Sequence, residues 1–137
     1  MLIIIRGPAD SNRENVAQEW IARGYKRYEA DDFFVNDEGE YHFNPHQLEA
    51  AHQLCLNSVK ESLRLGHNTI VTNTATRLWE FKGYLDYCWR HNIEYDIVDC
   101  LGFGINKYNT PHVTCVRQRN RFQPLASIMT DCVPPSK

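Results

Sequence analysis

The apolar positions of the chain fall into short continuous runs that alternate with longer segments of helical spacing. The runs at 2–6 (LIIIR), 68–72 (NTIVT) and 93–99 (IEYDIVD) are rich in β-branched side chains, and 25–29 is a further candidate strand. Continuous runs of this kind are typical of buried parallel strands. Apolar residues spaced by three and four positions instead predict helices over 12–23, 44–65, 78–90 and 110–122. Strands that alternate with helices predict an α/β fold with a parallel sheet.

Turn and capping residues mark the ends of these segments. Gly24 and Gly66 stand where two of the predicted helices should end, and Asn44-Pro45 is a helix start with Asn as N-cap. Asp37-Glu38-Gly39 predicts a turn between two short aromatic arms, in a hairpin or an irregular loop. With no repeat and no internal linker, we predict one domain over 1–123, followed by a Pro-containing tail over 124–137.

Charge is distributed unevenly along the 137 residues, although the net charge is only −2. The first 45 residues carry more acidic than basic side chains. Residues 100–130 contain Lys107, Arg117, Arg119 and Arg121 and no Asp or Glu. A near-neutral total gives no general attraction to nucleic acid or to a membrane, so a basic C-terminal segment is the part expected to face phosphates.

The cysteines and the N-terminus indicate the expected compartment. There are 5 cysteines, an odd number, and none has C-x-x-C spacing, which favours neither a disulfide framework nor a zinc site. The scattered histidines do not suggest a metal site, and the apolar run at 2–5 is too short for a signal peptide or a membrane span. We therefore expect a reducing, cytoplasmic setting with no membrane partner.

The loop after the first strand has the start of a phosphate-binding motif. That motif reads G-x-x-x-x-G-K-[ST] between a strand and a helix, and its N–H groups, lysine and hydroxyl hold phosphates and Mg²⁺. Gly7 matches the first glycine, but Asn12, Arg13 and Glu14 stand at the second glycine, the lysine and the hydroxyl. Asp10 adds another carboxylate, so the loop is expected to carry net negative charge.

These substitutions predict poor binding of ATP. Arg13 keeps a positive charge with a bulkier shape, whereas Glu14 places a carboxylate where phosphate oxygens would lie. Two like charges about 5 Å apart repel by roughly 3 kcal/mol at an effective dielectric near 20. A carboxylate at a helix N-terminus is itself stabilising, so Asp10 and Glu14 are interpreted either as built-in phosphate mimics or as ordinary acidic capping of a helix.

The order of the remaining segments resembles a family of small P-loop kinases. The relevant stretches are RG-x(4)-N at the start, ADDFFVNDEGEYHFNPHQLEAAH, TIVTNTATRLWEFKGYLDYC and NTPHVTCVRQRNRFQP. They are similar to those of bacteriophage polynucleotide-kinase-like proteins and NEDD4-binding-protein-2-like ATPases, over nearly the whole chain. The resemblance implies a three-layer P-loop NTPase fold of the kinase type, with a parallel central sheet and a degenerate Walker A motif.

The same resemblance assigns roles to individual residues. It makes Asp31 the candidate general base, vestigial if the chain is inactive, and it leaves Thr72 where the family carries a carboxylate near the metal. In the lid it offers Lys107, Arg117 and Arg121 as the basic residues. Phosphoryl transfer depends on positioning and charge neutralisation, so losses at Asn12, Arg13, Glu14 and Thr72 together remove most of that apparatus.

The sequence leads to one preferred hypothesis and two alternatives. The preferred one is a catalytically degenerate kinase-like protein that needs no cofactor and acts by binding. Its partner would be a protein or a nucleic-acid end, and one example is a phage-encoded modulator in the cytoplasm of a host cell. One alternative is an active, divergent polynucleotide 5′-hydroxyl kinase that uses Mg-ATP. The other is a non-catalytic binder of nucleic acid or nucleotide. The sequence specifies no oligomeric state.

The aromatic residues fall into two groups, the tryptophans of the predicted helices and a cluster around the 37–39 turn. Trp20, Trp79 and Trp89 fall on apolar helix faces and are predicted to lie in the core. The aromatics around the 37–39 turn have three readings: they stack on a base, form a protein-binding patch, or cover the edge of the sheet. This group is Phe33, Phe34, Tyr41 and Phe43.

Overall fold

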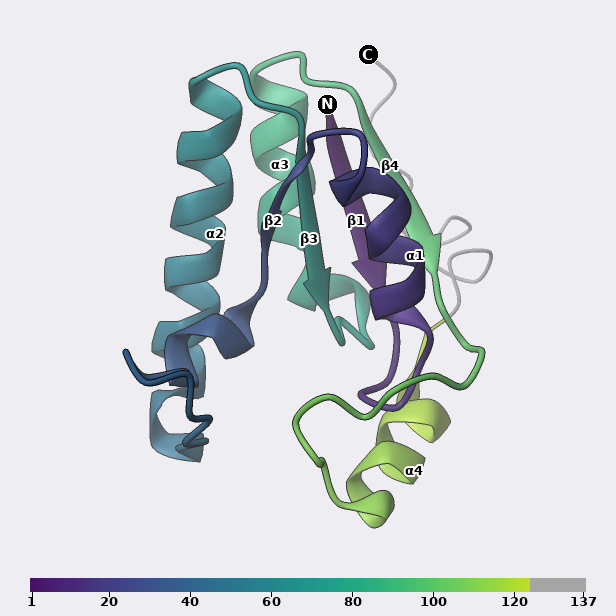
Figure 1. Cartoon of the computed structure of the whole chain (residues 1–137). Coiled ribbons are helices and arrows are strands. Elements are labelled where there is room, and N and C mark those ends of the chain that lie inside the picture. The colour runs from purple at the N-terminus through teal and green to yellow at the C-terminus, as the bar shows by residue number, and fades with distance from the viewer. Residues whose placement is uncertain (124–137) are drawn as a thin grey trace.

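A parallel sheet of four strands forms the centre of the computed structural model, which describes residues 1–123 (Figure 1). Its strands are β1 (Leu2–Arg6), β2 (Lys26–Tyr28), β3 (Thr69–Asn73) and β4 (Tyr95–Asp99), in the spatial order β2-β3-β1-β4. The predicted tail over 124–137 lies outside the described residues. The parallel α/β fold expected from the sequence is confirmed.

Strand β1 is the most deeply buried element, since its residues are all 2% exposed or less. It pairs with β3 and β4 in register, from Leu2 beside Thr69 and Tyr95 to Arg6 beside Asn73 and Asp99. Because all the strands are parallel, their carboxyl ends meet at one edge of the sheet. The connections that leave this edge carry the candidate functional residues.

Helices cover both faces of the sheet, which gives the three layers (Figure 1). Helices α2 (Leu48–Arg64) and α3 (Lys82–Arg90) pack against Leu2, Ile4 and Val71 on one face. Helix α1 (Arg13–Ile21) packs against Ile3, Ile5 and Ile70 on the other face. Helix α4 (His112–Arg121) lies beyond the carboxyl edge, next to the loop between β1 and α1.

Short 3-10 segments refine the predicted helices. The segment predicted from Asn44 begins with η2 (Pro45–Gln47), where the Asn44 side chain accepts a hydrogen bond from the His46 amide at 3.0 Å, and continues as α2. A further 3-10 segment, η1 (Ala30–Phe34), follows β2 and contains the paired aspartates. The helix predicted over 78–90 is divided into η3 (Leu78–Glu80) and α3.

This division corrects the prediction for the tryptophans. Trp79 is 72% exposed and Trp89 is 38% exposed, so neither is a core residue, whereas Trp20 packs against the cluster under α1. The physical reason is the break at Phe81, which is itself 1% exposed and occupies the core position at the start of α3. Trp79 is therefore out of phase with the buried face of α3 and faces solvent.

Candidate phosphate-loop site

The loop over residues 7–12 joins β1 to α1 at the carboxyl edge of the sheet, where the sequence places the phosphate-binding motif. A Cβ atom at Gly7 would lie 2.2 Å from the carbonyl oxygen of Cys100, so only glycine fits between these backbones. The Gly7 amide donates to the carbonyl of Thr74 at 3.1 Å. Gly7 is thus required for packing at this edge, whether or not phosphate is bound.

A segment after β4 lies across this loop; we call residues 101–108 the strap. The Asn12 amide donates to the Gly102 carbonyl at 3.0 Å, and the Gly104 amide donates to the Asp10 carbonyl at 2.9 Å. Between them, Ser11 and Phe103 form an antiparallel bridge. A Cβ atom at Gly104 would lie 2.6 Å from the carbonyl oxygen of Ser11, so the approach of the two backbones depends on glycine.

Other loop amides are also engaged within the chain. The Ala9 amide donates to the side-chain carbonyl of Gln118 on α4 at 2.7 Å, and the Ser11 amide donates to the Pro8 carbonyl at 3.0 Å. A phosphate-binding loop works by directing its backbone N–H groups at the ligand. Here the amides of Gly7, Ala9, Ser11 and Asn12 already have acceptors in the protein.

Two carboxylates, of Asp10 in the loop and of Glu14 in the first turn of α1, are held by cationic side chains. Asp10 forms an ion pair with Arg119 of α4 at 3.0 Å, and Arg119 also donates to the Leu101 carbonyl at 2.7 Å and stacks on Phe103. Glu14 forms ion pairs with Arg27 and, at 3.2 Å, with Lys107 of the strap. These acids thus connect the loop to α4, β2 and the strap.

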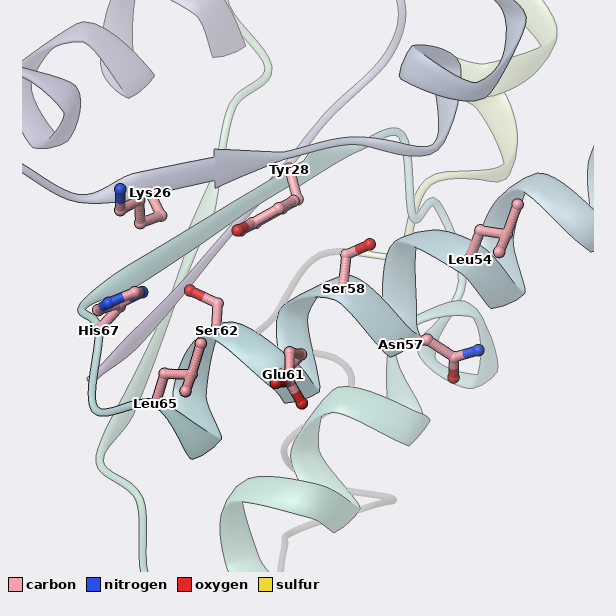
Figure 2. A pocket seen from close by; sticks show the side chains of 9 residues that line it. All are labelled: Lys26, Tyr28, Leu54, Asn57, Ser58, Glu61, Ser62, Leu65 and His67. Atoms are coloured by element: carbon pink, nitrogen blue, oxygen red, sulfur yellow. The ribbon is translucent and has the colours of Figure 1, made fainter.

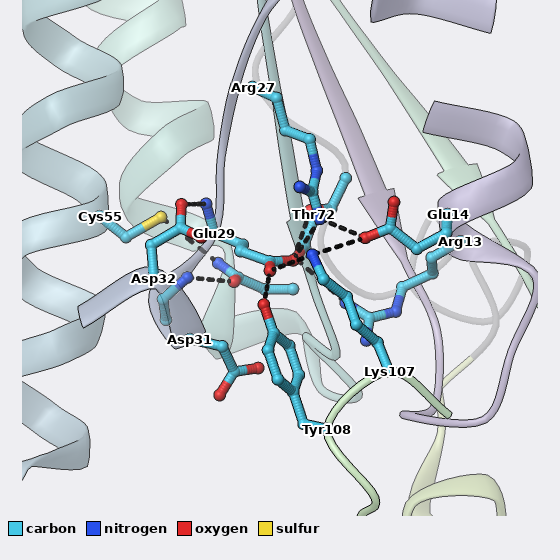
Figure 3. A network of polar contacts seen from close by, with 12 residues as sticks. Arg13, Glu14, Arg27, Glu29, Asp31, Asp32, Cys55, Thr72, Lys107 and Tyr108 are labelled. Atoms are coloured by element: carbon cyan, nitrogen blue, oxygen red, sulfur yellow. Dashed lines mark hydrogen bonds and ion pairs between the residues drawn. The ribbon is translucent and has the colours of Figure 1, made fainter. Parts of the chain in front are cut away.

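Glu29 is the centre of the polar network in Figure 3, although the sequence analysis did not identify it. It is 5% exposed and accepts from Arg27 at 2.8 Å, from Lys107 at 3.2 Å, from Thr72 at 3.0 Å and from the Tyr108 hydroxyl. Burial opposes ionisation of Glu29, but Arg27, Tyr108, Lys107 and Thr72 together hold the pKa of its carboxyl below the usual value. Glu29 therefore remains a buried carboxylate that fastens the strap to the sheet.

Arg13, the residue predicted at the lysine position of the motif, points toward the end of β3. Its Nη1 donates to the Thr72 carbonyl at 3.0 Å, and burial lowers the pKa of its guanidinium although Glu29, Asp31 and Glu14 favour the charged form. Four buried side-chain atoms have no hydrogen-bond partner among the described residues: Ser11 Oγ, Asn12 Oδ1, Arg13 Nε and Arg27 Nε. All lie in this site, so its hydrogen-bonding capacity is incompletely used.

Asp31, the candidate base, lies beside this network in η1. It accepts a hydrogen bond from the Tyr41 hydroxyl at 2.8 Å, and the Tyr41 ring stacks on Tyr108 with centroids 4.4 Å apart. Burial, assisted by the charge of Glu29, raises the pKa of the Asp31 carboxyl, and the pKa of Asp32 is raised for the same two reasons. Both carboxyl groups therefore bind a proton more readily than the carboxyl of an exposed aspartate does. Asp31 is the less exposed residue of the two.

The structure brings most of the predicted site together but leaves two lid arginines outside. Gly7, Asp10, Asn12, Arg13 and Glu14 lie under the strap, with Lys107 above them and Asp31 close by. Arg117 is exposed on α4, and the Arg121 Nε donates to Thr76 Oγ1 at 3.0 Å. The lid arginine that reaches the loop is Arg119.

Sequence reasoning assigned no role to Glu29 or Arg27, and it indicated Arg119 only as one member of the basic segment. One signal for Glu29 was available, because it directly follows β2 and the carboxyl ends of neighbouring parallel strands share an edge. Arg27 and Arg119 had no comparable signal, since each is placed by segments distant in the chain.

Replacing Asp31 by asparagine should stabilise the protein at neutral pH. A carboxyl whose pKa is raised in the folded state contributes stability only while it is protonated, and that contribution is lost as the pH rises through the folded-state pKa. The neutral amide still accepts from Tyr41. We expect a higher unfolding midpoint for Asp31→Asn at pH 7 and no difference below the ordinary pKa of aspartate, measured by thermal denaturation. A lower midpoint at pH 7 would contradict this assignment.

A hollow lies apart from this site, between β2 and α2. Lys26, Tyr28, Ser58, Ser62 and His67 are among the residues that line it (Figure 2). Lys26 pairs with Thr69 at the beginning of β3, so the hollow extends toward the amino ends of the strands, away from the loop.

Within residues 1–123, no group of three His, Cys, Asp or Glu side chains is arranged to hold a metal ion. No helix of this part of the chain has both the length and the apolar character needed to cross a membrane.

Comparison with known proteins supports the fold. No family model matches the sequence. A chain of the Pnkp1/Rnl/Hen1 RNA repair complex superposes with a TM-score of 0.59 at 18% identity, over 94% of this chain and 42% of that one. A second Pnkp1/Rnl/Hen1 complex gives 0.58 at 19% identity, over 85% and 38%. An unliganded sugar kinase from Janibacter sp. gives 0.52 at 13% identity, over 99% and 80%.

These likenesses concern architecture alone, because every identity is below 20%. The chain spans about two fifths of the two RNA-repair chains it matches, at 42% and 38% of their lengths. With the four-stranded parallel sheet and the loop between β1 and α1, they show that this chain has a kinase-like α/β fold.

Proposed function

We propose that this kinase-fold protein acts by binding a protein partner and does not transfer phosphate. The observation that carries the proposal is the strap, whose backbone is hydrogen-bonded to the loop that would receive the phosphates. A triphosphate would have to displace Gly102 and Gly104 from Asn12 and Asp10. The strap thus already engages the Asn12 amide, a backbone donor that a phosphate-binding loop would direct at its ligand.

Electrostatics also supports this proposal. The cations Arg27, Lys107 and Arg119 are each paired with a carboxylate of the site. Phosphoryl transfer requires positive charge that is available to the transferring group. An incoming phosphate would have to compete with Asp10, Glu14 and Glu29 for these cations, whose charge is already engaged within the chain.

Millimolar Mg-ATP should leave the thermal unfolding midpoint of the protein unchanged. A ligand that binds only the folded state raises its stability in proportion to the logarithm of its concentration over Kd, so a site with useful affinity would give a shift of several degrees. The measurement is differential scanning fluorimetry with Mg-ATP, with ATP and EDTA as the control. A nucleotide-dependent rise of several degrees would contradict the proposal.

One observation favours a second candidate, a divergent polynucleotide 5′-hydroxyl kinase. Asp31 has a raised pKa and lies among Tyr41, Arg13 and Glu29, an environment that suits a general base. In that case Arg13 would contact phosphates and Glu14 would hold Mg²⁺. Incubation with γ-labelled ATP and a 5′-hydroxyl oligonucleotide distinguishes the two: transfer that is lost in Asp31→Asn supports the kinase, and no transfer supports the binding protein.

A further inference from the structure

One exposed surface of the molecule is both acidic and apolar. Residues 30–49 contain no Lys or Arg, and we call their exposed part the acidic surface. Phe33 and Phe43 are 40% and 51% exposed and both pack edge-on against Phe34. Exposed acidic residues around them include Asp37, Glu38, Glu40 and Glu49.

A second exposed surface is basic and apolar. Residues 100–123 contain no Asp or Glu, and their exposed part, on the strap and α4, is called the basic surface. Its apolar residues are Phe103, which is 79% exposed, Ile105 (71%), Val113 (56%) and Val116 (39%). Helical spacing places Arg117 on the same outward side of α4 as the two valines, and Arg121 follows one turn later.

The strap that carries Phe103 and Ile105 is held against α4 and the residues just before it. Arg119 stacks on Phe103 at 3.9 Å, and the Asn106 side chain donates to the carbonyl of Thr110 at 2.7 Å. Ile105 therefore lies between two points at which the strap meets the α4 region. An exposed apolar group of this kind, with a charged border, is typical of an interaction site.

The two surfaces lie at the same end of the molecule. Residues 30–49 follow β2 and the strap follows β4, and both strands end at the carboxyl edge of the sheet (Figure 1). They meet within the chain where Tyr41 stacks on Tyr108 and Lys107 pairs with Glu29. The negative charges of the acidic surface lie on one side of these contacts, and the positive charges of the basic surface lie on the other.

We propose that the protein forms a two-fold symmetric dimer in which the acidic surface of each chain contacts the basic surface of the other. A two-fold axis near the line where the surfaces meet would make this contact twice and close the assembly. Apolar burial would supply the attraction, and charge complementarity would set the orientation. This dimer rests on the proposed binding function and names a second copy of the chain as the partner. Dimerisation is measured without nucleotide, so it can fail independently of the Mg-ATP experiment.

A second copy fits these observations better than a foreign acidic partner does. A foreign partner would use the basic surface alone and would leave the exposed aromatics of the acidic surface unexplained. The chain itself carries both halves of a complementary pair, each with apolar residues beside its charges. Dependence on both surfaces is therefore the property that the test has to measure.

Sedimentation velocity over a range of micromolar concentrations should show a dimer of the full chain at low salt. Arg117→Glu/Arg121→Glu should be monomeric, because both surfaces then carry negative charge. Asp37→Lys/Glu38→Lys/Glu40→Lys should also be monomeric, because both surfaces are then positive. An equimolar mixture of the two variants should recover the dimer, since each altered surface meets its opposite in the other chain.

The control is Lys82→Glu/Arg90→Glu on α3, which changes the net charge as much as the arginine variant does but lies outside both surfaces. It should dimerise like the wild type, and circular dichroism should give the same spectrum for all variants. A monomeric wild type, a dimer that survives either reversal, or a mixture that stays monomeric would each overturn the proposal. Binding of an oligonucleotide or an acidic peptide by a monomer would assign the basic surface to a foreign partner instead.

Discussion

Replacing Arg6 by methionine should lower the free energy of unfolding by about 3–5 kcal/mol, the range found when one member of a buried ion pair is removed. Arg6 is 0% exposed and lies at the end of the central strand β1. It forms an ion pair with Asp99 of β4 at 2.9 Å and donates to the carbonyls of Ala75, Thr76 and Gln123 at 2.8, 3.1 and 2.7 Å. Its guanidinium therefore connects the end of β4 with the segments that follow β3 and α4.

The size of this effect follows from what methionine would leave behind. The carbonyls of Ala75 and Gln123 would lose the donor that Arg6 supplies, and each buried unsatisfied group costs about 1–3 kcal/mol. The Thr76 carbonyl would keep the Gln123 amide, which donates to it at 2.8 Å. Methionine would still fill the space between Phe81 and Phe122, whose ring centroids lie 4.9 and 4.1 Å from the guanidinium carbon. The decrease in the free energy of unfolding therefore measures the lost hydrogen bonds and charge more than any lost packing.

Urea denaturation of the wild type and Arg6→Met measures this difference directly. Arg64→Met is the matched control, because Arg64 pairs with Glu61 on the exposed surface of α2 and should be replaceable without a measurable change. Equal stability of wild type and Arg6→Met would show that the buried guanidinium is not a structural link.

Replacing Glu29 by alanine should have the second largest effect, a loss of about 3 kcal/mol, since it removes one member of a buried network of ion pairs. The change would leave Arg27 and Lys107 to share Glu14 alone. Tyr108 and Thr72 would lose their acceptor, so the strap would no longer be fastened to the sheet. We expect faster hydrogen exchange at the amides of Asn12 and Gly104, which join loop and strap, as well as a lower unfolding midpoint.

Two other substitutions distinguish the role of Glu29 in holding the strap from a general loss of stability. Glu29→Gln keeps an acceptor for Tyr108 and should be less destabilising than alanine. Glu94→Ala removes an exposed glutamate next to β4 and should change neither stability nor exchange. Unchanged exchange at Asn12 and Gly104 in Glu29→Ala would contradict the role of Glu29 in holding the strap.

The same carboxylate gives a defined pH dependence. Its folded-state pKa lies below the ordinary value of 4.5, so its contribution to stability is present above that value and is lost as the pH falls through the folded-state pKa. The difference in stability between wild type and Glu29→Gln should therefore be constant near neutral pH and shrink in acid. The contribution of Asp31 to stability changes with pH in the opposite direction, because the pKa of its carboxyl is raised in the folded state.

Much of the fold could be predicted because it depends on local patterns. The run LIIIR forms a strand that is buried on both faces, and the Asn44-Pro45 start and Gly66 end of the long helix are set by capping and by a positive φ of 82° at Gly66. Trp79 was mispredicted because the interruption at Phe81 depends on how the segment meets the core. Helical periodicity carries no information about such a break.

The sequence by itself determined the parallel α/β architecture, and it predicted a phosphate-loop site after the first strand with altered residues at Asn12, Arg13 and Glu14. Only the tertiary structure decided how that loop is used: Glu29 and Arg119, 15 and 105 positions beyond Glu14, provide the charges that hold the strap and the loop carboxylates. Charge pairing between such distant residues depends on which strand ends become neighbours. That arrangement is fixed by the strand order and by the packing of α4, and no local pattern encodes it.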